Sequence, residues 1–232
     1  GVATGGLSLG ALLPYAPLLL APLVAALSTP VAAARAHAAA AFGTLMPLLP
    51  LESGVAPPED MSEAMREQRD AGRVLVRRLL DGAQLEPSAD ATKGLIKANL
   101  RSYQQEGVDW LLFLRRTGLH GILCDDMGLG KTVQSLSVVL LAAAEARAAA
   151  ADGVTRRRPS LVVAPTTLVG HWLAEAERWS ALDPPLRCVA YAGAPAARAK
   201  LLPTLSAHEL IITSYEVLRA DADALCGGDD AA

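Results

Sequence analysis

A short apolar run, a glycine-containing loop and a Lys-Thr pair follow one another at residues 121–132. The run Gly-Ile-Leu-Cys leads into Asp-Asp-Met-Gly-Leu-Gly, then into Lys131, Thr132 and a long helix-forming stretch. A strand that passes through such a loop into a helix is typical of parallel α/β folds. This segment constrains the fold more than any other, and it predicts a buried strand at residues 121–124.

The loop has the chemistry of a phosphate-binding site. Gly128 and Gly130 allow backbone angles that turn consecutive N–H groups toward an anion. A helix that begins near Lys131 adds the positive end of its dipole. We expect Lys131 to reach the β- and γ-phosphates of ATP and the Thr132 hydroxyl to bind Mg²⁺. The alternative is a glycine-rich turn with an incidental lysine, which the strand–loop–helix context disfavours.

The loop departs from the strict phosphate-loop pattern G-x-x-x-x-G-K-[ST] at its first position. Asp125 stands where that pattern has glycine, so only the second half of the pattern is matched. Val133 is incompatible with the pattern G-x-G-x-x-G, so a dinucleotide site is not supported. Asp125 and Asp126 also suggest metal ligands, but we interpret Asp126 as a loop residue near the nucleotide.

Strand-like and helix-like stretches alternate from about residue 100 onward. Short apolar runs occupy residues 121–124, 161–164, 187–191 and 210–213. Helix-forming stretches occupy residues 131–150, 168–179 and 194–202. This alternation indicates βαβ units and a parallel sheet. The predicted fold class is α/β.

Residues 1–50 are almost free of charge, and Arg35 is their single charged residue. They predict two helices, at residues 11–27 and 31–49, with Thr29 capping the second helix and Pro30 at its first position. Two apolar helices joined by a tight turn resemble one unit of a helical solenoid. The stretch 11–27 is nearly long enough to cross a membrane. Three prolines interrupt it, so we favour a helix packed among others and expect no membrane partner.

Charge and cysteine spacing argue against other classes of protein. The net charge of −3 gives no overall basic surplus, so any contact with DNA must come from a local patch or from other parts of the protein. Cys124, Cys188 and Cys226 are widely spaced and form no C-x-x-C pair, which argues against a zinc site or a disulfide framework. We expect Cys124 to be a small buried apolar residue.

Four segments, in order along the chain, resemble motifs of the SWI/SNF-type remodelling ATPases, a branch of the superfamily 2 helicases. The loop from Asp125 to Thr132 resembles their phosphate loop, in which an aspartate at the first position is a family trait. Residues 100–111 resemble the segment ahead of that loop, whose glutamine reads adenine, a role that falls on Gln104. Residues 161–172 resemble motif Ia and residues 211–216 resemble motif Ib, both of which face the DNA backbone.

The resemblance implies a RecA-like parallel sheet with flanking helices, the cofactors ATP and Mg²⁺, and double-stranded DNA as a partner. The implied nucleotide contacts are Gln104, Asp125, Asp126, Met127, Gly128, Leu129, Gly130, Lys131 and Thr132. The implied DNA contacts are Thr166, Thr167, Thr213 and Ser214. Two alternatives stay open: Thr213 and Ser214 either touch the DNA backbone or simply end a strand. Trp172 we interpret as a core residue rather than a DNA contact.

The resemblance is closest to one subfamily, the TATA-binding-protein-associated factor ATPases. It is carried by residues 120–132, by Gly170-His-Trp172 and by the connector at residues 51–62. In that subfamily HEAT repeats hold TATA-binding protein and the ATPase acts on the adjacent DNA. The resemblance therefore implies a nuclear protein that removes TATA-binding protein from DNA. The implied domains are a HEAT-like repeat at residues 1–52, a connector with an amphipathic helix at 53–99, and the first part of the ATP-binding lobe at 100–232.

The D-E-x-H segment that follows motif Ib in this family is not found in the 232 residues. Its carboxylates position Mg²⁺ and the attacking water. We therefore expect these residues to bind ATP without hydrolysing it, as a fragment of a longer DNA-dependent ATPase. The competing hypothesis is an interaction scaffold, in which the helical N-terminus binds a protein and the nucleotide site is vestigial. Mg²⁺-dependent ATP binding separates the two hypotheses.

Overall fold

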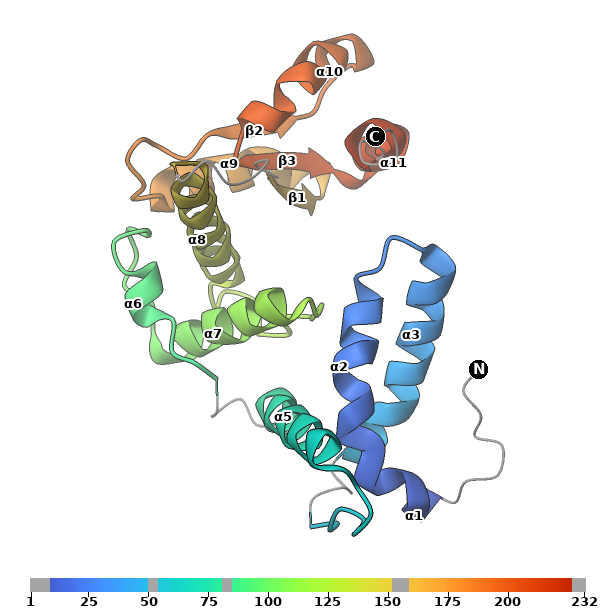
Figure 1. Ribbon diagram of the computed structural model, residues 1–232. Helices are drawn as coiled ribbons and strands as arrows, with labels where there is room; N and C mark the ends of the chain where they lie inside the picture. Colours follow the sequence, from blue (N-terminus) through green and yellow to red (C-terminus); the bar gives the residue numbers. More distant parts are fainter. Residues whose placement is uncertain (1–8, 50–53, 81–84, 152–158, 227–232) are drawn as a thin grey trace. The chain divides into compact units, whose positions relative to one another are not determined.

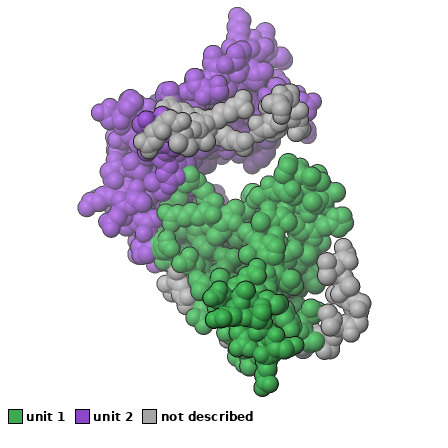
Figure 2. Space-filling view, in the orientation of Figure 1, with its two compact units in different colours: residues 1–86, 109–122 green, residues 87–108, 123–232 purple. Residues whose placement is uncertain are grey.

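The structure is a computed structural model that describes residues 9–49, 54–80, 85–151 and 159–226 (Figure 1). The chain divides into two compact units, which Figure 2 colours separately. Unit 1 comprises residues 1–86 and 109–122, and unit 2 comprises residues 87–108 and 123–232. Helix α7 (Ser102–Thr117) contributes residues to both. Each unit has a hydrophobic core of its own.

Unit 1 is helical. Its elements are α1 (Leu9–Leu12), the 3₁₀ helix η1 (Leu13–Tyr15), α2 (Ala16–Leu27), α3 (Ala32–Leu45), the 3₁₀ helix η2 (Met46–Leu48) and α5 (Glu63–Leu80). Its core is formed by Ala16, Leu20, Val24, Leu45, Leu49 and Val76. The buried Arg69 of α5 donates hydrogen bonds to the carbonyls of Pro14 and Val55, at 2.8 and 2.7 Å. The predicted helix pair and the predicted amphipathic helix are confirmed.

The predicted cap of the second helix is wrong. Helix α3 begins at Ala32, its N-cap residue is Val31 in an extended conformation, and no side chain caps it. The Arg35 guanidinium instead donates hydrogen bonds to the carbonyls of Thr29 and Pro30, at 2.7 Å each. Arg35, in the first turn of α3, therefore holds Thr29 and Pro30, the two residues that were expected to start the helix.

Unit 2 contains a parallel sheet of three strands among its described residues. The strands are β1 (Ser160–Ala164), β2 (Cys188–Tyr191) and β3 (Leu210–Ser214), in the order β1-β3-β2. The central strand β3 is buried along its whole length. The main helices are α8 (Lys131–Ala151), α9 (Val169–Trp179) and α10 (Pro195–Leu201). The shorter elements are α6 (Ala89–Thr92), η4 (Thr166–Leu168), η5 (Leu202–Ala207), α11 (Tyr215–Ala220) and α12 (Ala222–Cys226). The α/β class is confirmed.

Helix α8 is the one helix of the described residues that is long and apolar enough to cross a membrane. Its Leu136 and Leu140 are buried in the core of unit 2 together with Leu210 and Ile212 of β3. A core helix passes the same test of length and composition. The position of α8 against the sheet accounts for its apolar sequence.

The predicted strand at residues 121–124 is wrong. These residues have no regular secondary structure, and the boundary between the two units falls between Ile122 and Leu123. Ile122 is 82% exposed, and Cys124, which we expected to be buried, is exposed as well. A four-residue apolar run does not by itself distinguish a strand from an irregular connection. We predicted a strand here because a strand usually precedes a phosphate loop. In this structure the loop forms without a strand before it.

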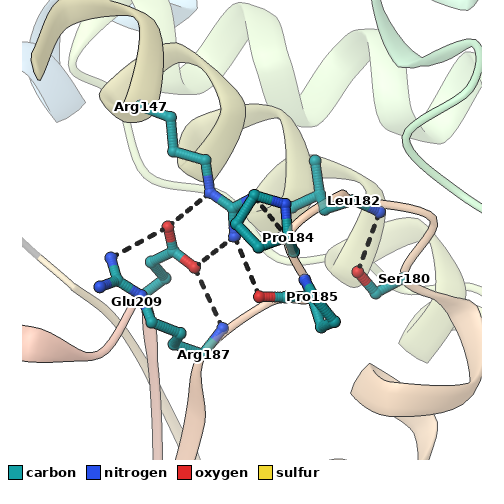
Figure 3. Close-up of polar contacts among 7 residues, drawn as sticks. All are labelled: Arg147, Ser180, Leu182, Pro184, Pro185, Arg187 and Glu209. Atoms are coloured by element: carbon teal, nitrogen blue, oxygen red, sulfur yellow. Dashed lines mark hydrogen bonds and ion pairs between the residues drawn. The ribbon is translucent and has the colours of Figure 1, made fainter. Parts of the chain in front are cut away.

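A partly buried ion pair joins the C-terminal half of α8 to the start of β3 (Figure 3). Glu209 directly precedes β3, and its two carboxylate oxygens each accept a hydrogen bond of 2.7 Å from Arg147. Arg147 also donates to the carbonyl of Pro184 at 2.6 Å, and the backbone N–H of Arg187 donates to Glu209 at 3.0 Å. Because α8 begins at the phosphate loop, this cluster fixes the helix on which the candidate site depends.

The stability of unit 2 is expected to depend on pH through Glu209. Hydrogen bonds from Arg147 and Arg187 lower the pKa of Glu209 from 4.5 to about 2, against the opposing effect of burial. A lowered carboxylate pKa stabilises the fold above pH ~4.5, and this contribution is lost as the pH falls toward ~2. We expect this group alone to lower the free energy of unfolding by about 3 kcal/mol over that range.

Urea unfolding followed by circular dichroism, at several pH values across that range, measures this effect. The Glu209→Gln variant lacks the titrating group and is expected to show a flatter dependence on pH. Equal pH dependence in the two proteins would contradict the assignment.

Candidate nucleotide-binding site

The loop ahead of α8 has two glycines in the left-handed region of backbone conformation. Gly128 has φ 86° and Gly130 has φ 85°, values that side chains other than hydrogen rarely allow. Beyond Gly128 and its two chain neighbours, no atom of the described residues lies within 4 Å of the place where a Cβ of Gly128 would stand, so the loop is open there. A Cβ at Gly130 would collide with the side-chain amide of Gln104. The loop conformation therefore requires both glycines, as the motif predicts.

The side chain of Lys131 folds back onto this loop. Its Nζ donates hydrogen bonds to the carbonyls of Asp125 and Asp126, at 2.6 and 2.8 Å. The acceptors are neutral carbonyl oxygens rather than carboxylates, so the ammonium keeps its net positive charge. An anion with several oxygens, such as a triphosphate, fits a cation held in this way at a helix N-terminus.

Gln104 lies against the same loop. Its Nε2 donates to the carbonyl of Leu129 at 3.0 Å, and its Oε1 accepts from the backbone N–H of Arg101 at 3.0 Å. The second bond is half of a capping box at the start of α7. The structure thus brings Gln104, predicted from a segment more than twenty residues upstream, to the phosphate loop.

The Asp125 carboxylate points toward α8. Its Oδ2 accepts a hydrogen bond of 3.0 Å from the Nε2 of Gln134, which is fully buried. Asp126 and Met127 are exposed, and Met127 is 97% exposed. Our sequence analysis missed Gln134. The available signal was a lone amide side chain among the apolar residues of α8, one turn after Gly130.

Two of the four predicted DNA contacts are exposed. Thr166 and Thr167 lie in η4, directly after β1. The Thr166 hydroxyl donates a hydrogen bond of 3.0 Å to the Glu216 carboxylate. The pKa of Glu216 is lowered, most strongly by a hydrogen bond from its own backbone and then by hydrogen bonds from Ser214 and Thr166. Both threonines are accessible to a large polar ligand at this end of the sheet.

The other two predicted contacts are buried. Thr213 donates a hydrogen bond of 2.7 Å to the carbonyl of Tyr191, and Ser214 accepts one of 3.3 Å from the backbone N–H of Val217. Ser214 is thereby the N-cap of α11. Both side chains therefore bond within the protein, at the junction of β3 and α11. Trp172 packs against the core of unit 2, as interpreted from the sequence.

The residues around the loop fit ATP with Mg²⁺. The loop supplies the Lys131 ammonium on two neutral carbonyls, an open backbone surface at Gly128 and the N-terminus of a 21-residue helix. Among the described residues, no group of three or more His, Cys, Asp or Glu side chains is arranged to hold a metal ion. A Mg²⁺ bound through Thr132 would take its other ligands from phosphate oxygens and water, as this ion usually does.

Comparison with known proteins identifies the family. The model of the SNF2-related domain matches residues 103–228, which contain the loop, the whole sheet and α8 to α11. "TATA-binding protein-associated factor mot1" of Aspergillus fumigatus is 41% identical over 217 residues, covering 92% of this chain and 11% of that protein. "TATA-binding protein-associated factor 172" of Homo sapiens is 40% identical over 217 residues, covering 91% of this chain and 12% of that protein.

A solved structure, "Sulfolobus solfataricus SWI2/SNF2 ATPase core in complex with dsDNA", is 34% identical, with a TM-score of 0.42, and the match covers 58% of this chain and 24% of that one. The chain spans about a tenth of the length of the curated relatives it matches. The family model nevertheless covers more than half of the chain, including all of the candidate site from Gln104 onward. The chain belongs to the SNF2-related domain family, the SWI/SNF-type ATPases that its motifs resemble.

Proposed function

We propose that residues 100–232 are the ATP-binding part of a DNA-dependent ATPase that remodels protein–DNA complexes. The observation that carries the proposal is the Lys131 ammonium, held by neutral carbonyls over a loop with two left-handed glycines. The β- and γ-phosphates would bind at Lys131, and Mg²⁺ would bridge them to the Thr132 hydroxyl. Gln104 would contact the adenine, as in the family that the chain resembles.

The proposed partners are double-stranded DNA and TATA-binding protein. The exposed hydroxyls of Thr166 and Thr167 suit contacts with the DNA backbone. The relatives are TATA-binding protein-associated factors by name, which supports removal of TATA-binding protein from DNA and a nuclear location. The helix pair of residues 1–52 would be a HEAT-like repeat, joined to the ATP-binding part by the connector at 53–99.

ATP binding by the 232-residue chain tests the first part of the proposal. A fluorescent ATP analogue is titrated with the chain, with Mg²⁺ and with EDTA. We expect saturable binding that Mg²⁺ strengthens at least tenfold, and competition by unlabelled ATP. An interaction scaffold with a vestigial site predicts no saturable binding in either condition, and that result would reject the proposal.

The same 232 residues are expected to release no phosphate above background when double-stranded DNA is added. The reason is that their sequence contains no D-E-x-H segment to position Mg²⁺ and water. A coupled phosphate assay at saturating ATP measures this. DNA-stimulated release that Lys131→Ala abolishes would show that the carboxylates are not needed or lie elsewhere.

The role of TATA-binding protein requires a separate measurement. The longest protein that contains these residues is mixed with TATA-binding protein on a fluorescent DNA duplex, with and without ATP. The proposal expects ATP-dependent release that Lys131→Ala prevents. Equal release by the unmodified protein and by Lys131→Ala would contradict the remodelling role without contradicting ATP binding.

A further inference from the structure

Asp125 occupies the position at which a strict phosphate loop has glycine, next to a site that must accept several negative charges. Two polar groups, the ammonium of Lys131 and the amide of Gln134, donate hydrogen bonds to this one residue. The carboxylate accepts from Gln134 at 3.0 Å, and Lys131 bonds instead to the Asp125 main-chain carbonyl at 2.6 Å. Asp125 thus holds Lys131 through its main-chain carbonyl, while its carboxylate bonds to Gln134.

The side chain of Gln134 is held in one orientation. It is fully buried in α8, one turn after the loop. Its Nε2 faces the Asp125 carboxylate, so its Oε1 faces the other way, where it has no hydrogen-bond partner among the described residues. A Cβ on Gly107 of α7 would collide with this Oε1. A buried carbonyl oxygen without a donor is destabilising, which argues that the residue is used for the bond that its other end makes.

We propose that Gln134 is a positioning residue that keeps the Asp125 carboxylate away from Lys131. The Lys131 ammonium already bonds to the main-chain carbonyl of the same residue, so it is the partner that we expect the carboxylate to take when this donor is lost. An ion pair between the two would neutralise the charge that is needed for the phosphates and would place a second negative charge beside them. The inference rests on the proposed binding of ATP at this loop.

The Gln134→Leu variant tests the inference, because leucine has a similar volume and no donor. We expect it to weaken Mg²⁺-ATP binding by the 232-residue chain about tenfold or more. Adding Asp125→Asn removes the charge that would pair with Lys131. The double variant is therefore expected to bind ATP within about threefold of Asp125→Asn alone, which keeps an acceptor for Gln134. Failure of the double variant to recover would overturn the proposal.

Thermal stability separates positioning from a general structural role. Gln134→Leu removes the unpartnered Oε1, so the melting temperature is expected to stay the same or rise while ATP affinity falls. Ser137→Ala is the matched control: Ser137 is equally buried in α8 and bonds to the Val133 carbonyl, away from the loop. We expect this control to leave ATP affinity unchanged. If Gln134→Leu lowers the melting temperature together with the ATP affinity, Gln134 has a structural role only.

A measurement without nucleotide keeps this inference independent of the proposed function. Amide hydrogen exchange of residues 125–131, followed by mass spectrometry, reports the loop in the nucleotide-free chain. Gln134→Leu is expected to speed exchange there at least about tenfold, and Asp125→Asn in the same protein to reverse much of the change. If the unmodified chain binds no ATP, the proposed function fails. If exchange in Gln134→Leu equals that of the unmodified chain, the positioning role fails.

Discussion

Replacing Lys131 with alanine is expected to weaken Mg²⁺-ATP binding at least about 100-fold, because two charge-assisted hydrogen bonds contribute about 1.5–3 kcal/mol each. The ammonium lies over the loop on two neutral carbonyls, at 2.6 and 2.8 Å. Phosphate oxygens can replace these weaker acceptors without breaking an ion pair. Isothermal titration calorimetry of the 232-residue chain with ATP and Mg²⁺ measures the change.

Two variants serve as controls for this prediction. Lys200→Ala removes an exposed lysine of α10 and is expected to leave the affinity unchanged, which excludes an effect of net charge. Lys131→Arg keeps the charge in a different shape and is expected to give an intermediate loss. An affinity of Lys131→Ala within threefold of the unmodified chain would mean that the phosphates bind elsewhere.

Replacing Glu209 with alanine is expected to lower the free energy of unfolding of unit 2 by about 3 kcal/mol. This is the lower end of the usual cost of removing one partner from a buried pair, because Arg147 is only partly buried. The Glu209 side chain is 5% exposed and accepts hydrogen bonds from two arginines. Its loss leaves the Arg147 guanidinium, itself 18% exposed, without the carboxylate to which it bonds. Because Arg147 belongs to α8, we also expect a weaker attachment of that helix to β3. Urea unfolding near neutral pH measures the change.

The Glu209 prediction has two internal checks. Glu177→Ala removes an exposed glutamate from α9 and is expected to change the stability by less than about 0.5 kcal/mol. Arg147→Ala is expected to cost less in the Glu209→Ala background than in the unmodified chain, since the charge it removes is then already unpaired. Additive losses would contradict a direct coupling between the two side chains.

The order of elements in unit 2 could be predicted because its signals are local. Apolar runs of four or five residues separated by helix-forming stretches gave the three strands and α8, α9 and α10 close to their observed bounds. The prediction failed at residues 121–124, where a run of the same composition is exposed and irregular. Whether such a run becomes a strand depends on a neighbouring strand to pair with, and the sequence of the run does not contain that information.

The candidate site was predictable where backbone conformation dictates the residue, as at Gly128 and Gly130. The site was not predictable where a side chain bonds to a residue outside the motif. Nothing in the motif indicates that Gln134 holds Asp125, or that Glu209 meets Arg147 across 62 positions. The same limit explains the hydroxyl residues. Thr166 follows β1 and is exposed, whereas Thr213 lies in β3, which is buried between two neighbouring strands.

The central claim is that residues 125–132 hold the phosphates of ATP. The most direct measurement is the backbone amide NMR spectrum of the ¹⁵N-labelled chain during titration with Mg²⁺ and a non-hydrolysable ATP analogue. The account predicts that the largest shifts occur at Gly128, Gly130, Lys131 and Thr132, with smaller ones at Gln104, and that Lys131→Ala abolishes them. Saturable shifts that cluster elsewhere in the chain, or no shifts at saturating analogue, would contradict it.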